Sequence, residues 1–329
     1  MININLKLHN YKDLVEKHKV YLENYIEKRY SEKENSFKHK DAIFFKDYLG
    51  RTTSEVAKKL LDICTSSDLK KIAEDFEIAY LEHYRKDFKA EAYQRKKSKT
   101  IKHKQISKYL DYILNYDGFN KGTGNWNRHK FLSKLGVKVC PYCNRNYITT
   151  YIEDTFKTTA DADHYYPKWI YPILQMNLYN MIPCCNVCNS KMKGAKDIRH
   201  LYPYKDLSSS LKFSTNIDTL ETLYNFTEDI VKINITPYNQ EAQNSVEIFK
   251  LHKVYEIHKD IIFGLKRKIY AYEAFQREYY NKMLGDELGN RIFNGIDVDS
   301  YWFDFLNKDP LDEPLAKMKQ DIYKQLTSK

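Results

Sequence analysis

The chain has 329 residues, with 54 Lys and Arg against 44 Asp and Glu, and its net charge is +10. Hydrophobic residues make up 42% of it, enough to form a core, which excludes a wholly disordered protein. No apolar run approaches the roughly 20 residues needed to cross a bilayer, and the first residues lack a secretion signal. We therefore expect a cytoplasmic protein with no membrane partner and two or three folding units.

The first region, residues 1–125, is predicted to be helical. Glycine and proline are scarce in the chain, with 10 and 8 residues, which disfavours a turn-rich all-β fold. Apolar side chains recur at helical spacing over residues 14–30 and again over residues 69–80. Residues 52–55, Thr-Thr-Ser-Glu, have the form of a capping box. The Gly- and Asn-rich segment 117–125 breaks the helical pattern and is the predicted linker.

The second region, residues 126–210, changes character. Residues 147–152 are β-branched and aromatic, which predicts a strand, and residues 156–163 are predicted to run back as a second strand. A helix is predicted to begin within residues 185–193. The third region, residues 211–329, again has apolar side chains at helical spacing. The predicted fold class is therefore mainly α with a small α+β insert between two helical regions.

The positive charge is concentrated in one segment. Residues 85–145 contain 16 Lys and Arg against 4 Asp and Glu, so the rest of the chain is slightly acidic. Such a block is typical of a groove that binds a polyanion. The alternative is a solvated helix face or a mobile loop. The predicted nucleic-acid-binding residues of its densest part are Arg95, Lys96, Lys97, Lys99, Lys102 and Lys104.

Two C-x-x-C pairs stand 41 residues apart in the middle region. Two such pairs supply four thiolates, the ligand set of a tetrahedral structural Zn²⁺ site, and zinc would support a small, core-poor unit. A redox C-x-x-C is the alternative, and Cys184 could replace its neighbour. The sixth cysteine, Cys64, is expected to be a buried apolar residue. The predicted zinc ligands are Cys140, Cys143, Cys185 and Cys188.

Between and after these pairs lie polar residues in a specific order. Asp163 and His164 begin the segment D-H-Y-Y-P-K, Asn180 begins N-M-I-P-C-C, and Asn189 directly follows the last cysteine. Together with the cysteine pairs, over residues 136–205, this order resembles the HNH (ββα-metal) endonuclease family. The resemblance implies a zinc-stabilised ββα-metal core that hydrolyses phosphodiester bonds, and the expected substrate is DNA.

The chemistry explains why these residue types are needed. Attack of water on a phosphodiester requires a base, and the phosphate and leaving oxygen require a cation. His164 suits the base because its ordinary pKa of about 6.5 leaves it largely neutral in the cell. The resemblance implies that Asp163 and Asn189 hold one Mg²⁺ or Mn²⁺ ion, although the family often has His at the position of Asn189. It also implies that Asn180 fixes the loop that orients the base.

Other residues and functions stay open. Lys168 and Lys193 are close enough in sequence to bind phosphates or to be solvated, and His200 is either a spare ligand or a packed residue. The wider arrangement resembles the HNH component of bacterial antiphage systems such as Septu, which implies a defence role with an ATPase partner. The alternatives are a non-catalytic zinc-knuckle protein that binds nucleic acid and an RNA-cleaving toxin nuclease. The sequence specifies no oligomeric state.

Overall fold

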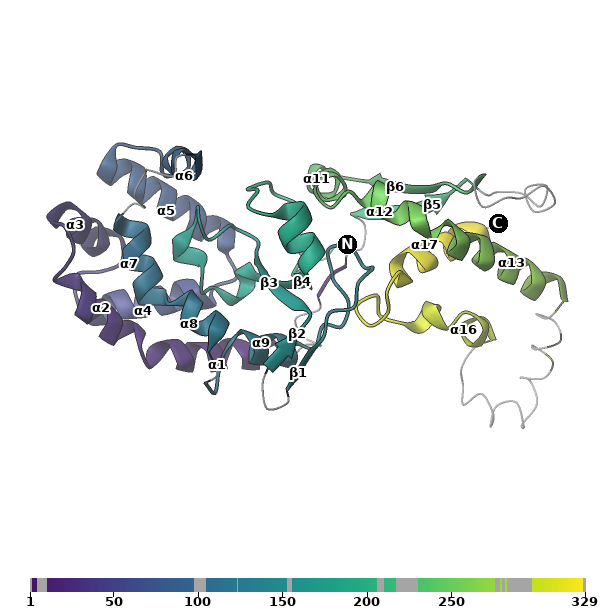
Figure 1. The fold of residues 1–329 in the computed structure, drawn as a ribbon, viewed down its shortest axis with the longest axis horizontal. Helices are drawn as coiled ribbons and strands as arrows, with labels where there is room; N and C mark the ends of the chain where they lie inside the picture. Colours follow the sequence, from purple (N-terminus) through teal and green to yellow (C-terminus); the bar gives the residue numbers. More distant parts are fainter. Residues whose placement is uncertain are drawn as a thin grey trace.

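The computed structural model describes residues 2–4, 11–97, 105–122, 124–152, 156–205, 210–216, 230–275, 279, 282 and 298–327. Within these residues the chain is mainly helical, with three two-stranded antiparallel sheets. The mainly α fold class with a small β part is therefore confirmed. The helical N-terminal part and the C-terminal part lie at opposite ends of an elongated molecule, and β3 and β4 lie between them (Figure 1). No helix in the described ranges is long and apolar enough to cross a membrane.

The N-terminal part packs its helices through their apolar faces. Leu14, Leu22, Ile26 and Leu60 are all buried, and α1 and α2 both pack against α4. The predicted capping box is confirmed, because Thr52 accepts a hydrogen bond from the Glu55 backbone and the Glu55 side chain accepts one from the Thr52 backbone. The helices are α1 (Tyr11–Glu23), α2 (Ile26–Glu34), α3 (His39–Tyr48), α4 (Thr53–Thr65), α5 (Leu69–Tyr84), α6 (Phe88–Lys97), α7 (Gln105–Leu114), α8 (Tyr116–Lys121) and α9 (Arg128–Leu135).

The predicted linker 117–125 is wrong in its first half, which belongs to α8. Phe119 on this helix is fully buried, with its ring centroid 5.4 Å from that of His18. Burial of the aromatic side chains outweighs the low helix propensity of glycine and asparagine. The predicted nucleic-acid-binding residues of the densest basic part cannot be placed. Lys99, Lys102 and Lys104 lie outside the described residues, and so do the side chains of Arg95, Lys96 and Lys97.

The β part is organised differently from the predicted hairpin. Strand β1 (Thr150–Ile152) pairs with β2 (Phe156–Thr158), but the chain then forms a separate strand, β3 (Ala160–His164), which pairs with β4 (Met181–Cys185). In this register His164 lies opposite Met181. The predicted single strand 156–163 is therefore two strands with different partners. Strand β4, the partner of β3, was not predicted, because a long loop separates the two strands in the sequence.

A π-helix, Val187–Lys193, follows β4 in place of the predicted helix of residues 185–193. It ends at Gly194, whose φ of 53° lies in the left-handed region that favours glycine, and whose N–H donates to the Asn189 carbonyl at 2.7 Å. Single π turns are rare and often lie at functional sites. This turn carries both Cys188 and Lys193.

The C-terminal part is also not wholly helical. Strands β5 (Leu211–Thr215) and β6 (Ile233–Pro237) form a hairpin that packs against the last helix. The alternation of buried Leu211 and Phe213 with exposed Lys212 is the period-two pattern of a half-buried strand, so the sequence contained a usable indication. The helices here are α11 (Gln240–Ile248), α12 (Leu251–Tyr255), α13 (Lys259–Phe275), α16 (Val298–Trp302) and α17 (Ala316–Thr327).

A buried histidine joins the N-terminal helices to the centre. The fully buried ring of His18 accepts a hydrogen bond from Trp126 Nε1 at 3.1 Å and donates through Nε2 to the Met176 carbonyl at 2.7 Å. Burial lowers the pKa of His18 to about 4, against a smaller opposing effect of the Met176 hydrogen bond. The ring is therefore neutral in the folded chain at pH 7.

We expect acid to destabilise the fold partly through His18. Its contribution is fully present above the unfolded pKa of about 6.5 and is lost as pH falls towards the folded value. The free energy of unfolding should therefore fall by about 2 kcal/mol between pH 7 and pH 5 on account of this residue. Urea unfolding at both pH values should show a smaller loss for His18→Asn than for the wild type, while exposed His252→Asn keeps the wild-type loss. Equal losses in all three proteins would contradict the assignment.

Candidate active site and metal centre

The four cysteines predicted to bind zinc form one cluster. Cys140 and Cys143 lie in the turn after α9, Cys185 ends β4, and Cys188 lies in the π-helix. All four are buried, and their Sγ atoms lie within 4.8 Å of one another. Thiolates bound to one zinc at about 2.3 Å would stand roughly 3.8 Å apart, so the donor set fits a metal ion such as zinc. The cluster contains Cys185 and not Cys184.

The thiol pKa values of the cluster shift in opposite directions: hydrogen bonding with Cys140 raises the pKa of Cys188, and burial raises the pKa of Cys140. The Asn146 side-chain amide donates to Cys185 Sγ at 3.2 Å. Hydrogen bonding with Cys140 lowers the pKa of both Cys143 and Cys185. The cluster is also tied to the C-terminal part, because the Tyr255 hydroxyl donates to the Cys143 carbonyl at 2.6 Å. A metal bound here would hold β4, the π-helix and the turn after α9 together.

Removal of one cysteine from each pair should remove the metal. We expect the wild type to hold one zinc ion per chain and the double variant Cys143→Ser/Cys188→Ser to hold none. The double variant should also lose most of its stability, because structural zinc contributes of order 10 kcal/mol. Elemental analysis and urea unfolding measure the two effects. Cys184→Ala is the matched control, since it removes a buried cysteine beside the cluster and should keep the zinc. A double variant with full zinc content would disprove the site.

His164 ends β3 with its ring held in one orientation. Nε2 lies 2.9 Å from the Gln175 carbonyl, and because a carbonyl only accepts, the proton must be on Nε2 and the lone pair on Nδ1. Nδ1 has no hydrogen-bond partner among the described residues, and His164 as a whole is 9% exposed. Burial lowers the pKa of His164 to about 4. The ring is thus a neutral imidazole with an available lone pair.

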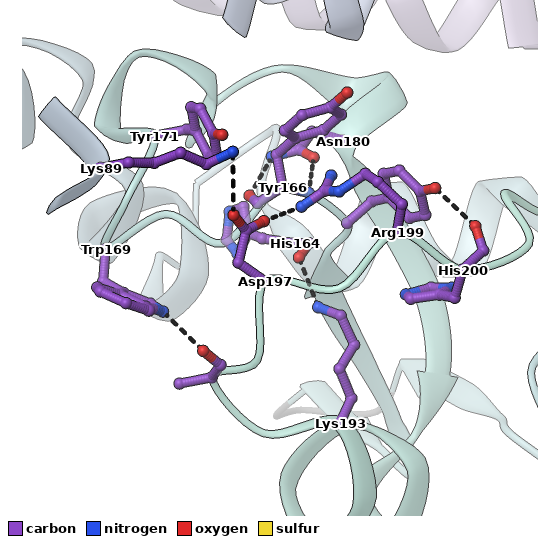
Figure 2. Close-up of polar contacts among 12 residues, drawn as sticks. Lys89, His164, Tyr166, Trp169, Tyr171, Asn180, Lys193, Asp197, Arg199 and His200 are labelled. Atoms are coloured by element: carbon purple, nitrogen blue, oxygen red, sulfur yellow. Dashed lines mark hydrogen bonds and ion pairs between the residues drawn. The ribbon is translucent and has the colours of Figure 1, made fainter. Parts of the chain in front are cut away.

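Asn180 fixes the loop that orients this ring. Its amide donates to the Leu174 carbonyl at 3.1 Å. The amide also donates to the Tyr166 carbonyl at 3.0 Å, and its oxygen accepts from the Tyr166 backbone N–H at 2.7 Å (Figure 2). Leu174 directly precedes Gln175, the residue that binds the His164 ring. The fully buried Asn180 side chain therefore holds both sides of the loop, which fits the orienting role implied by the resemblance.

Asp163 lies in a buried ion pair. Its carboxylate accepts hydrogen bonds from Lys193 Nζ at 2.8 Å and from the Tyr142 hydroxyl at 2.7 Å, one on each oxygen. Lys193 also donates to the His164 carbonyl at 2.8 Å (Figure 2). The Lys193 and Asp163 side chains are only 2% and 4% exposed. Lys193 is therefore unavailable to a phosphate in this arrangement, in contrast to its predicted role.

The residues predicted to hold Mg²⁺ or Mn²⁺ make other contacts in the structure. Asn189 donates its amide to Asp161 at 3.1 Å, and no hydrogen bond or ion pair joins it to Asp163 in the described chain. Both Asp163 oxygens are occupied, and the Lys193 ammonium stands where a cation would bind the carboxylate. Because Mg²⁺ needs several oxygen ligands in octahedral geometry, the side chains as placed do not fit an ion at Asp163.

Two further predicted residues, Lys168 and His200, differ in exposure. Lys168 is 44% exposed, forms an ion pair with Asp117 at 3.5 Å and lies 4.6 Å from the Tyr116 ring, whose centroid is 4.5 Å from that of His164. It thus places a positive charge beside the histidine. His200 is fully buried against Tyr142 and Tyr165, which favours the packing role.

Sequence reasoning missed Gln175, Tyr142 and Asp161. Gln175 acts through its backbone carbonyl, for which no side-chain pattern exists. Tyr142 lies inside the first C-x-x-C pair, a pattern that assigns no role to the residues between its cysteines. Asp161 is two residues before Asp163, so it lies on the same face of β3, and this spacing was an available indication.

Comparison with family models, curated proteins and solved structures finds no match for this chain. The functional assignment therefore depends on the motifs and on the geometry described above.

Proposed function

We propose that this chain is an endonuclease of the HNH type that hydrolyses DNA, with His164 as the general base. The observation that carries the proposal is the orientation of His164, whose Nε2–H is held by Gln175 while Nδ1 keeps a lone pair with no hydrogen-bond partner among the described residues. Support comes from Asn180, which fixes the loop, and from the four-cysteine cluster at the end of β4. These elements follow the motif order that resembles the HNH family.

The proposed step is a proton transfer coupled to in-line attack. Nδ1 of His164 takes a proton from water as the water oxygen bonds to phosphorus. The bond from phosphorus to the leaving sugar oxygen breaks, and that oxygen takes the electron pair and a proton from a second water molecule. The Gln175 carbonyl stabilises the imidazolium that forms, because it accepts the Nε2–H. Lys168, beside the site, attracts the phosphate. The 16 basic residues of segment 85–145 favour a polyanion as substrate.

The test is incubation of the zinc-loaded protein with supercoiled plasmid and with RNA, after desalting and with Mg²⁺ or Mn²⁺ added in steps. We expect nicked and linear plasmid and little RNA product. Preferred cleavage of RNA would favour the toxin nuclease, and no cleavage of either polymer under any of these conditions would contradict the proposal.

One observation favours a non-catalytic alternative. The Lys193–Asp163 ion pair fills the position where the family's carboxylate would face a cation, and a purely structural zinc module that binds nucleic acid needs no free carboxylate there. The two functions separate in a single experiment, because a binding module retards plasmid on a gel without changing its topology.

A partner ATPase is proposed on the resemblance to Septu-type antiphage systems alone. Affinity purification of the tagged chain expressed with its neighbouring genes should recover an ATPase. Recovery of the chain alone, together with unregulated cleavage of plasmid, would remove this part of the proposal.

A further inference from the structure

A cavity of about 440 Å³ lies where three parts of the chain meet. Its walls come from the start of α5, from the segment that follows His164, and from residues 199–205 with the first turn of α11. The volume falls within the range of small-molecule sites. The lining residues are Ser67, Asp68, Leu69, Lys70, Ala73, Glu74, Glu77, Lys89, Tyr165, Tyr166, Tyr171, Arg199, Tyr202, Lys205 and Glu241.

The walls are aromatic more than aliphatic. Tyr166 has its ring centroid 5.2 Å from that of Tyr171 and 5.6 Å from that of Tyr165, and Tyr165 lies 4.8 Å from Tyr202. The Arg199 guanidinium lies 3.9 Å from the Tyr166 ring centroid. Tyrosine rings with a stacked guanidinium are the surfaces on which proteins stack nucleobases.

The buried carboxylate of Asp197 pairs with two cations of the cavity. Arg199 contacts Asp197, and Lys89 lies 3.6 Å from the same carboxylate, which is 3% exposed (Figure 2). Lys89 also lies 3.7 Å from Glu77. The lining itself contains four basic and four acidic side chains, so it offers acceptors for the amino groups of a base as well as cations for a phosphate. A lipid or other apolar ligand would leave these groups unpaired.

We propose that this cavity binds a nucleotide, with the base against the tyrosine walls and the phosphate at Lys70 and Lys205 on its exposed side. The nucleotide is either an unpaired residue of the nucleic-acid substrate or a free mononucleotide. The substrate form rests on the proposed nuclease function and has a structural basis: Tyr166 is two residues from His164, and Asn180 binds the Tyr166 backbone. A base held here is tied to the loop that orients His164.

Calorimetric titration of the wild type with dAMP and with deoxyadenosine tests the cavity without requiring cleavage. Arg199→Gln removes the guanidinium from Tyr166 and should weaken both ligands about tenfold. Lys70→Glu/Lys205→Glu changes two exposed side chains and should weaken dAMP while leaving deoxyadenosine unchanged. Arg29→Gln is the matched control, because Arg29 lies 5.1 Å from the Tyr112 ring outside the cavity lining, and it should bind both ligands normally.

A competition experiment distinguishes a substrate residue from a free mononucleotide. It measures whether dAMP displaces a five-nucleotide single strand from the His164→Asn variant, which leaves the strand intact. Competition assigns the cavity to a substrate residue, and its absence assigns it to a free nucleotide. No saturable binding of dAMP to the folded wild type, or binding that Arg199→Gln and the lysine variant leave unchanged, would overturn the proposal. Binding of N-acetylarginine amide in place of dAMP would also overturn the proposal, because it would indicate that the cavity takes a side chain of a partner protein. Binding of dAMP by a protein that cuts no DNA would refute the nuclease and leave the cavity assignment standing.

Discussion

Replacement of His164 by Asn is expected to lower the rate of DNA cleavage by about 10²- to 10⁴-fold, the usual contribution of a general base. Asparagine matches the Nδ1 edge of the ring but is too short to reach the Gln175 carbonyl, which His164 Nε2 meets at 2.9 Å, so the variant loses this hydrogen bond without burying a charge. It has no ring nitrogen to accept a proton from water. The variant should therefore fold, keep its zinc and bind DNA, but fail in the chemical step.

Plasmid cleavage under single-turnover conditions measures this loss, and gel retardation measures DNA binding by the same protein. His252→Asn is the control, because it removes an exposed histidine and should cut at the wild-type rate. Cleavage by His164→Asn within a few-fold of the wild type would exclude His164 as the base.

Lys193→Met should lower the free energy of unfolding by about 3–5 kcal/mol, because it leaves the Asp163 charge buried with only the Tyr142 hydroxyl as a partner. The same change also removes the hydrogen bond to the His164 carbonyl. Asp163→Asn alone should cost a comparable amount, since it leaves the Lys193 ammonium without its counter-charge. The double variant buries no charge and should recover part of the loss.

Urea unfolding of the four proteins in this cycle gives the coupling energy. Lys138→Met supplies the comparison, because the Lys138–Asp312 pair has a similar distance of 2.8 Å but side chains that are 63% and 49% exposed. Its loss should be below about 1 kcal/mol. If Lys193→Met costs no more than Lys138→Met, the ion pair is not a structural element of the core.

The features that the sequence predicted well depend on local patterns or on a recognisable ligand motif. The capping box at Thr52 needs only Glu55 three positions later, and it forms. The cysteine pairs have a spacing that metal coordination requires, and their four Sγ atoms gather. The helical periodicity of the N-terminal region likewise follows from local repeats, which survive whatever the tertiary arrangement.

The features that it missed depend on contacts between distant residues. Lys193 looked like a surface cation because lysine is rarely buried, and only the proximity of Asp163, 30 residues earlier, explains its burial. The pairing of β3 with β4 likewise needed the fold of the loop that carries Gln175. The ion site expected from Asp163 and Asn189 assumed that both side chains face one cation, whereas their contacts are Lys193 and Asp161.

The central claim is that His164 is a neutral imidazole with its proton on Nε2 and a free lone pair on Nδ1. Nuclear magnetic resonance of ¹⁵N-histidine-labelled, zinc-loaded protein detects the proton on each ring nitrogen directly, with His164→Asn identifying the resonance. We expect a single neutral form protonated on Nε2 at pH 7, unchanged down to about pH 5 because burial lowers its pKa to about 4. A ring protonated on Nδ1, or a charged imidazolium at pH 7, would contradict the assignment of His164 as the base.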